Sequence, residues 1–322
     1  MLLQPGLPNW EVHDPAAGVA DWRGRTALRV EKGGPVLLSQ DPGLAAFHLE
    51  ADLALEGEAG YVGLVFGARD HANHELVYVY RGEGKHGWIQ YDPVMNGSNT
   101  WQVYHGPRYQ SSRLVVPPGG WVHLALRVEP GRVAITAGDA PEPQLVVSPL
   151  MLGARGKVGV WGYGRGYASE LAIRPWSYQP ANLVPAGELP AGSITRWQVA
   201  DCADGPWRDA VVEENGVLNL NRHFAVGGPN PTAYARAEVH SQAACEAGCS
   251  LGFSDRVRLL VNGAEVYQGE WRWEPPATDG RIRPDHTTLK VPLLPGSNVI
   301  MAEVAATEPP FGWGLVLSLS RA

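Results

Sequence analysis

FHLEADLAL, residues 47–55, alternates apolar and polar side chains along its length. Successive side chains of an extended chain point to opposite faces, so the apolar residues of this stretch share one face. They are Phe47, Leu49, Ala51, Leu53 and Leu55. WVHLALRVE, residues 121–129, repeats the pattern. Such alternation predicts half-buried β-strands, and long stretches with the 3.6-residue period of a helix are missing.

Short strand-like runs separated by turn residues continue through both halves of the chain. Glycine (39 residues) and proline (27 residues) are abundant, as in folds that join many short strands by tight turns. Asn262-Gly263, between two alternating runs, predicts a type I′ hairpin. Residues 175–195 carry four prolines and little periodicity, which is typical of a linker. The sequence predicts an all-β protein with sandwich domains at 1–176 and 195–322, joined by a linker at 177–194.

The bulk composition limits the classes of binding partner that the protein is expected to have. The chain has 322 residues, with 26 Lys+Arg against 33 Asp+Glu and a net charge of -7. No basic cluster points to nucleic acid, and no apolar run is long enough to span a membrane. A mildly acidic, aromatic-rich surface suits a neutral polar partner such as a glycan or small sugar. It equally suits a protein with no such partner.

The cysteines and the N-terminus bear on the compartment. Cys202, Cys245 and Cys249 are an odd number, and MLLQPGLPNWEVHDP lacks the basic and apolar regions of a signal peptide. These features predict free thiols and a cytoplasmic protein, or a secreted one if a leader has been trimmed from the sequence.

Several stretches of the first half resemble a known group of sandwich domains. They are YVGLVFGARD (61–70), NHELVYVYRG (73–82), WIQYDPVMNGSNTWQVYHGP (88–107), WVHLALRVEPGRVAI (121–135) and GKVGVWGYGRGYASELAI (156–173). Together they cover about 10–176 and are similar to laminin-G-like, concanavalin A-like domains of bacterial proteins, close to the 3-keto-disaccharide hydrolase-like group. The resemblance implies a concanavalin A-like jelly roll and does not identify a reaction.

The second half resembles galactose-binding-like jelly-roll domains over roughly 195–322. The stretches that carry the resemblance are LGFSDRVRLLVNGAEVYQG (251–269), LPGSNVIMAEV (294–304) and FGWGLVLSL (311–319). Such modules commonly accompany carbohydrate-active enzymes, where they bind glycans or only pack against the neighbouring domain. The fold therefore does not by itself give the function.

Glu75 and His105 are the catalytic candidates. A carboxylate beside His74 could serve as a general base, and with His105 it would supply acid/base groups for a glycoside hydrolase or lyase. The favoured alternative is that Glu75 is a strand-entry residue that hydrogen-bonds a turn. A second acidic set shares one face of the strand at 47–55, where a solvated charged face is favoured: Glu50, Asp52 and Glu56.

QYDPVMNGSNTWQVYHGPRY, residues 90–109, combines aromatic rings with amides, which is the composition of a sugar site. The predicted ligand-binding residues here are Gln90, Asn96, Trp101, Tyr104 and His105. We expect the segment to form the wall of a concave groove, with Trp101, Tyr104 and His105 partly exposed over a buried Tyr91. The equally weighted alternative is that Trp101 and Tyr104 wedge the loop onto the sheet.

Trp271 and Trp273 are the ligand-binding candidates of the second half. They lie two residues apart in WRWEPPATDGRIRPDH (271–286), so they share one face of an extended segment. They could stack on a glycan, but docking onto the first domain is favoured over glycan binding.

The histidines are scattered without transition-metal spacing, so no metal site is predicted. No cofactor is expected, although related sandwiches leave room for a structural calcium. The leading hypothesis is a carbohydrate-recognition protein without established catalysis. A glycoside hydrolase or lyase acting on a sugar derivative is the first alternative. A structural or protein-interaction module is the second.

Overall fold

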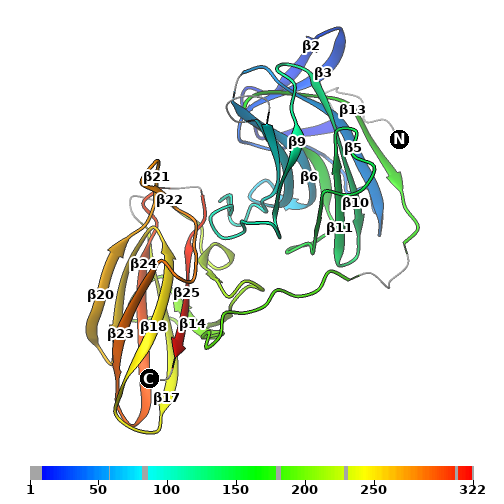
Figure 1. Ribbon diagram of the computed structural model, residues 1–322. Helices are drawn as coiled ribbons and strands as arrows, with labels where there is room; N and C mark the ends of the chain where they lie inside the picture. Colours follow the sequence, from blue (N-terminus) through cyan, green and yellow to red (C-terminus); the bar gives the residue numbers. More distant parts are fainter. Residues whose placement is uncertain are drawn as a thin grey trace. The chain divides into compact units, whose positions relative to one another are not determined.

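The computed structural model describes residues 9–57, 59–81, 86–178, 183–227, 231–308 and 311–320 (Figure 1). Strands dominate it, and a 3-10 turn spans Leu220–Arg222. The predicted all-β fold class is therefore confirmed. Within the ranges just given, no helix is long and apolar enough to cross a membrane.

The chain forms two compact units. The first comprises 1–94 and 104–185, and the second comprises 95–103 and 186–322. The transition at 185/186 falls inside the region where the sequence predicts a linker. The assignment of 95–103 to the second unit differs from the contiguous first domain expected from sequence.

The described residues of the first unit form thirteen strands. They are β1 (Trp10–Val12), β2 (Gly18–Trp22), β3 (Arg25–Lys32), β4 (Val36–Leu38), β5 (Phe47–Leu55), β6 (Gly60–Asp70), β7 (Asn73–Arg81), β8 (His86–Tyr91), β9 (Gln110–Val115), β10 (Trp121–Glu129), β11 (Arg132–Ala137), β12 (Leu145–Val147) and β13 (Lys157–Pro175). All belong to one hydrogen-bonded, antiparallel sheet that contains the path β12-β11-β10-β5-β13-β6-β7-β8-β9.

The long strand β13 turns this sheet into a sandwich. Its first part, from Lys157 to Tyr163, pairs with β6 and β4, and its later part, from Gly166, pairs with β5 and β3. Gly164, at φ +74, provides the bend between the two parts. A strand that changes sheets at a bend is a known way to build the corner of a sandwich. One layer then contains β6, β7 and β8, and the other contains β5 and β10.

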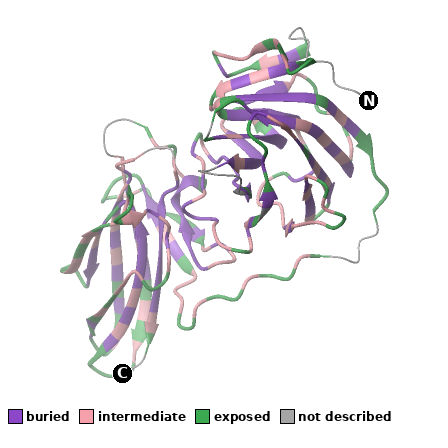
Figure 2. Ribbon diagram, turned by 45° about the horizontal axis from the view of Figure 1, so that its top comes forward, coloured by how far each residue is buried: buried purple, intermediate pink, exposed green. Residues whose placement is uncertain are grey.

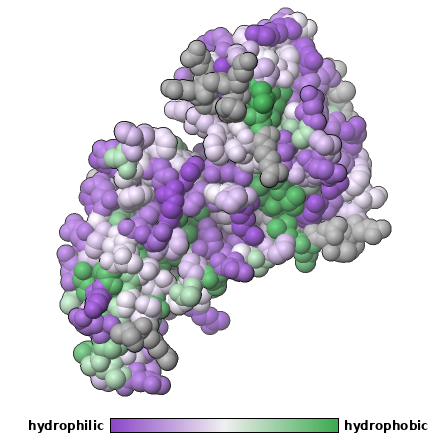
Figure 3. Space-filling view, viewed as in Figure 1, coloured by the Kyte–Doolittle hydropathy of each residue, from purple (hydrophilic) through white to green (hydrophobic). Residues whose placement is uncertain are grey.

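Burial follows the alternation seen in the sequence. All five apolar residues of β5 named above are at most 1% exposed, so the predicted core face is confirmed. Figure 2 shows buried positions concentrated along the strands and exposed positions in many connections. In the view of Figure 3 much of the surface is hydrophilic or intermediate in hydropathy, with smaller apolar areas.

The second unit has two facing sheets. Its strands are β14 (Arg196–Ala200), β15 (Arg208–Val211), β16 (Leu218–Asn219), β17 (Thr232–Ser241), β18 (Cys245–Ser254), β19 (Arg256–Val261), β20 (Ala264–Glu270), β21 (Trp273–Glu274), β22 (Thr278–Asp279), β23 (Thr287–Leu293), β24 (Gly296–Ala305) and β25 (Gly314–Ser320). The sheet orders are β15-β14-β17-β24-β19-β20 and β16-β25-β18-β23, with β21-β22 as a separate pair.

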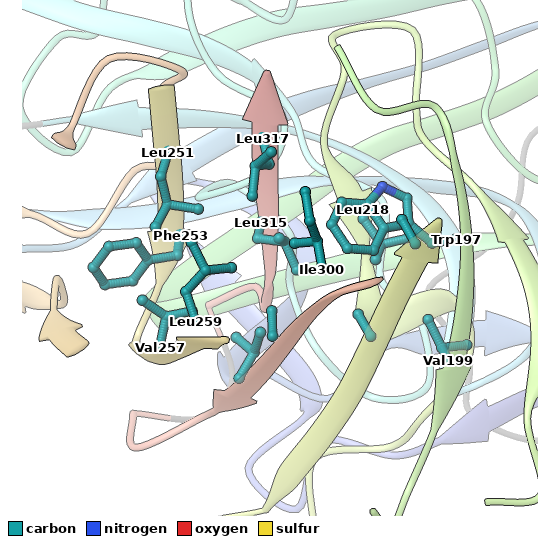
Figure 4. Close-up of a cluster of buried hydrophobic side chains, with 14 of the residues drawn as sticks. Trp197, Val199, Leu218, Leu251, Phe253, Val257, Leu259, Ile300, Leu315 and Leu317 are labelled. Carbon is teal, nitrogen blue, oxygen red and sulfur yellow. The ribbon is translucent and has the colours of Figure 1, made fainter. Parts of the chain in front are cut away.

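Apolar side chains from both sheets fill the space between them (Figure 4). Leu251, Phe253, Leu315 and Leu317 come from the four-stranded sheet, and Leu259 and Ile300 are among those from the six-stranded sheet. The hairpin predicted at Asn262-Gly263 joins β19 to β20. Its residues have φ +50 and +80, as a type I′ turn requires, so this prediction is confirmed.

All three cysteines are free, as predicted. Cys202 and Cys245 are exposed, whereas burial raises the pKa of the Cys249 thiol to about 11. We therefore expect two thiols of the native protein to react quickly with a thiol reagent and the third to react only after unfolding. Three fast thiols would show that the sheet around Cys249 opens readily.

Candidate functional site

Four aromatic residues from four neighbouring strands lie directly opposite one another in the first unit. Tyr163 of β13 pairs with Tyr61 of β6, and Tyr61 pairs with Tyr80 of β7. Tyr80 in turn pairs with Trp88 of β8. Opposite residues of paired strands project from the same face, so these four side chains form one line, called the aromatic row below. At about 4.8 Å between strands, the row spans about 14 Å.

The row lies on the outer face of its layer. The alternate positions of the same strands, Val62, Val79 and Ile89, also pair with one another and are at most 1% exposed. These residues face the interior of the sandwich. In contrast, Tyr163 is 60% exposed and Trp88 is 42% exposed, so the two ends of the row are open to solvent.

Ring contacts order the middle of the row. Tyr61 and Tyr80 stack with centroids 4.7 Å apart and an interplanar angle of 22°, and Tyr163 lies 6.4 Å from Tyr61. The two stacked rings cover each other's facing surfaces. The ends of the row therefore offer ring surface, and the half-buried middle offers ring edges and hydroxyl groups.

A second line of residues supports the row from the neighbouring positions of the strands. Trp161 lies opposite Gly63, and Gly63 lies opposite Tyr78. The rings of Trp161 and Tyr78 are 5.6 Å apart and nearly buried. A Cβ atom at Gly63 would lie 2.2 Å from the Val77 carbonyl oxygen, so only glycine fits here. This close packing fixes the part of the sheet that lies beside the row on the same face.

The phenol of Tyr61 remains neutral at ordinary pH. Burial, together with Tyr80, Tyr163 and the carboxylate of Asp92, raises the pKa of Tyr61 to about 12. A neutral phenol can both donate and accept a hydrogen bond. The row therefore combines exposed rings with the uncharged hydroxyl of Tyr61, a surface suited to an uncharged, hydroxyl-bearing ligand.

Two predicted ligand-binding residues of the first unit are buried. Gln90 lies opposite Tyr78 but is only 2% exposed, because its Nε2 donates to the carbonyl oxygens of Tyr91 (2.6 Å) and Tyr104 (3.0 Å). Tyr104 has no exposed surface and packs edge-on against Tyr109. The expectation that Tyr104 is partly exposed is wrong, and the expectation that Tyr91 is buried is confirmed.

Glu75 lies in the interior of the first unit, with no exposed surface. Its Oε2 accepts from the Tyr91 hydroxyl at 2.5 Å, and its Oε1 accepts from the amides of Met151 (2.7 Å) and Gly153 (3.3 Å). Burial raises the pKa of this carboxyl, and the hydrogen bonds oppose that shift. The proposed general-base role does not fit, because the carboxylate is bonded to the protein and cannot reach a substrate. His105 is half-buried in the loop before β9.

The acidic face of β5 is a charged network. Glu50 pairs with Arg174 at 2.7 Å, and Asp52 pairs with Arg25 and with His123 at 2.8 Å. These carboxylates are partly exposed and engaged by cations, so the favoured interpretation as a solvated charged face holds. Across the described ranges, no group of three or more His, Cys, Asp or Glu side chains could hold a metal ion.

Residues 95–103, called the clasp below, pack within the second unit. Trp101 is half-buried there, edge-on to Trp273 (5.4 Å) and tilted against Phe311 (5.5 Å). The Asn96 side chain donates to the Asn221 carbonyl oxygen at 2.7 Å. Asn96 and Trp101 are thus engaged by the protein itself, which corresponds to a packing role for this loop.

Gln102 is anchored by both its side chain and its backbone. Its Nε2 donates to Glu308 Oε1 at 2.7 Å, and its Oε1 accepts from the Ser254 hydroxyl at 3.0 Å. Its backbone amide donates to Phe311, and its carbonyl oxygen accepts from Ile282. Composition alone does not distinguish such a residue from a ligand-binding one, because both need polar partners.

Trp271 and Trp273 differ in their surroundings. Trp271 is half-buried, its Nε1 donates to the Arg281 carbonyl oxygen at 3.2 Å, and its ring lies 4.1 Å from that of His286. Trp273 is 46% exposed and contacts Trp101. The first is therefore held by its neighbours, and only the second presents a large ring surface.

No family model matches the sequence, and a comparison with curated proteins gives no match either. Among solved structures, the carbohydrate binding module CBM66 from Bacillus subtilis is 17% identical, with a TM-score of 0.40, over 52% of this chain and 96% of that one. A xylan beta-1,4-xylosidase from Bacillus halodurans is 16% identical, with a TM-score of 0.37, over 53% and 38%. Sheep galectin-11 is 10% identical, with a TM-score of 0.31, over 51% and 100%.

Proposed function

We propose that this chain is a carbohydrate-recognition protein that binds a neutral sugar through the aromatic row. The observation that supports this most directly is the register that aligns Tyr163, Tyr61, Tyr80 and Trp88 on one outer face. Sugars present C–H faces to aromatic rings and hydroxyls to polar groups, and the row offers both kinds of contact. The two exposed rings, Trp88 and Tyr163, lie at the ends of the row, where a ligand can reach them.

A glycoside hydrolase similar to the 3-keto-disaccharide hydrolase-like group is the alternative, and it needs a carboxylate near the row. Asp92 directly follows β8 and its charge acts on Tyr61, but Asp92 is only 1% exposed, which counts against direct contact with a substrate. Asp92→Asn distinguishes sugar recognition from glycoside hydrolysis. A recognition protein should still bind the sugar after this substitution, whereas a hydrolase that uses Asp92 should lose turnover. Turnover that persists in Asp92→Asn would remove Asp92 from consideration.

The row is tested by replacing its two exposed ends. We expect Trp88→Ala and Tyr163→Ala each to weaken binding about tenfold or more, because each removes a ring that stacks on the sugar. The probes are neutral mono- and disaccharides on a glycan array, followed by calorimetric titration of the strongest binder. The melting temperature should change little, since both rings are substantially exposed.

The matched control is Trp176→Ala, a tryptophan that is 38% exposed and follows the end of β13. It removes the same side chain from a different surface, so binding should stay at the wild-type level. The proposal fails if no neutral sugar binds at millimolar concentration. It also fails if the control weakens binding as much as Trp88→Ala does.

A further inference from the structure

The outer face of the six-stranded sheet in the second unit contains a groove of about 350 Å³. Its walls come from β14, β15, β17 and β24. The polar and apolar residues that shape it are Arg196, Gln198, Asp209, Arg236, Glu238 and Val299. It is a separate surface from the aromatic row and from the clasp.

Three of these side chains are fixed in a line across three strands. Arg236 lies opposite Gln198, and Gln198 lies opposite Asp209. The Arg236 Nε and Nη2 atoms donate to Gln198 Oε1 at 3.0 and 2.9 Å, and Gln198 Nε2 donates to Asp209 Oδ1 at 3.2 Å. The Arg236 guanidinium also lies 4.2 Å from the centre of the Trp207 ring. The line is therefore held in place before any ligand arrives.

Arg196, Glu238 and Val299, the other residues that shape the groove, have exposed side chains that a ligand could contact. Arg196 is exposed and forms no ion pair with any residue in the described part of the chain. Glu238 is exposed and accepts from the Ser297 hydroxyl. Val299 lies opposite Glu238 and is 44% exposed, which provides an apolar surface next to the charges.

The charges of the groove indicate the class of ligand. The two guanidinium groups and the two carboxylates balance, so neither an anion nor a cation is favoured overall. A pair of neighbouring hydroxyls can accept from a guanidinium and donate to a carboxylate, and a sugar C–H face can contact Val299. We infer that this groove is a second saccharide site, for a neutral sugar. It would make the chain bivalent, and it does not require the aromatic row to bind.

The test follows the Nε–Hε signals of Arg196 and Arg236 by NMR in the full-length protein. The probes are maltose, cellobiose, lactose and sucrose, with glucuronate as the anionic counterpart. We expect a neutral disaccharide to shift both signals, and Arg196→Ala to weaken that interaction about tenfold when followed at Arg236. Arg256→Ala, which removes an exposed arginine from β19 of the same sheet, should leave the affinity unchanged.

Three outcomes would overturn the inference. The first is that no neutral sugar shifts either arginine signal at millimolar concentration. The second is a shift that Arg196→Ala leaves unchanged, and the third is tighter binding of glucuronate than of every neutral sugar. Trp88→Ala distinguishes this site from the aromatic row, because it should weaken binding at the row about tenfold or more and leave the arginine shifts intact.

Discussion

Replacing Glu75 with alanine is expected to lower the free energy of unfolding of the first unit by about 3–5 kcal/mol, because buried donors lose their acceptor at about 1–3 kcal/mol each. Those donors are the Tyr91 hydroxyl and the amides of Met151 and Gly153. Denaturant unfolding, followed by hydrogen exchange at Met151 and Gly153, measures the effect. A loss below about 1 kcal/mol, typical of a surface substitution, would contradict it.

Glu75→Gln keeps the size of the side chain but removes its titration, so the pH dependence of stability isolates the effect of the charge. Because the folded state raises the pKa of Glu75, its favourable contribution is present below the unfolded value and is lost as pH rises through the folded value. Glutamine does not titrate, so the stability of wild type relative to Glu75→Gln should fall as pH rises above about 4.5. Melting curves from acid to neutral pH measure this. Parallel pH profiles for the two proteins would show that Glu75 does not titrate in this way.

The interior position of Glu75 was readable from the sequence. In ELVYVY the period of two places Glu75 on the same face as Val77 and Val79, and that face is the core. The catalytic hypothesis rests on the adjacent histidine, whereas this alternation favours an interior position for Glu75. The same period put the apolar residues of β5 on one buried face, and there the prediction is confirmed.

The aromatic row needed information that local patterns do not contain. Alternation gives the face on which Tyr61, Tyr80, Trp88 and Tyr163 lie within their own strands. It does not say which strands are neighbours, because register depends on pairing between distant segments. Tyr163 meets Tyr61 only because β13 changes layers at its glycines and its first part pairs with β6. The composition of 90–109 instead predicts a binding site at rings that pack against other parts of the protein.

The clasp illustrates the same limit for polar residues. Gln102 obtains its hydrogen bonds from Ser254 and Glu308, which are 152 and 206 residues away in sequence. A polar side chain in a loop signals only that it needs a partner, and the partner can be a ligand or the protein. Here both partners belong to the protein itself, so we expect loss of the Gln102 side chain to lower stability.

Gln102→Ala is expected to lower the free energy of unfolding of the second unit by about 2–4 kcal/mol. The substitution removes one hydrogen bond to a carboxylate, at about 1.5–3 kcal/mol, and one to a buried hydroxyl, at about 0.5–1.5 kcal/mol. Glu308 keeps the Trp273 amide as a donor, and the Ser254 hydroxyl keeps Asp255 as a partner, so no further cost is expected from either group. Hydrogen exchange of the Ile282 amide reports the same loss locally, because this amide donates to the Gln102 carbonyl oxygen. Its exchange should accelerate. Gln268→Ala, on the exposed face of β20, is the matched control and should change neither quantity.

Gly280→Ala should disturb the packing around the Gln102 side chain, because Gly280 lies against its amide group. A Cβ atom at Gly280, where φ is +65, would lie 2.3 Å from Gln102 Nε2 and 2.9 Å from the Trp273 amide nitrogen. Overpacking of this kind costs about 1–3 kcal/mol. In the double variant Gln102→Ala/Gly280→Ala, the added methyl group no longer meets the glutamine side chain. The double loss should therefore be smaller than the sum of the single losses, since side chains in contact couple. Strictly additive losses would show that Gln102 and Gly280 act independently, and that the clasp is not held at this position.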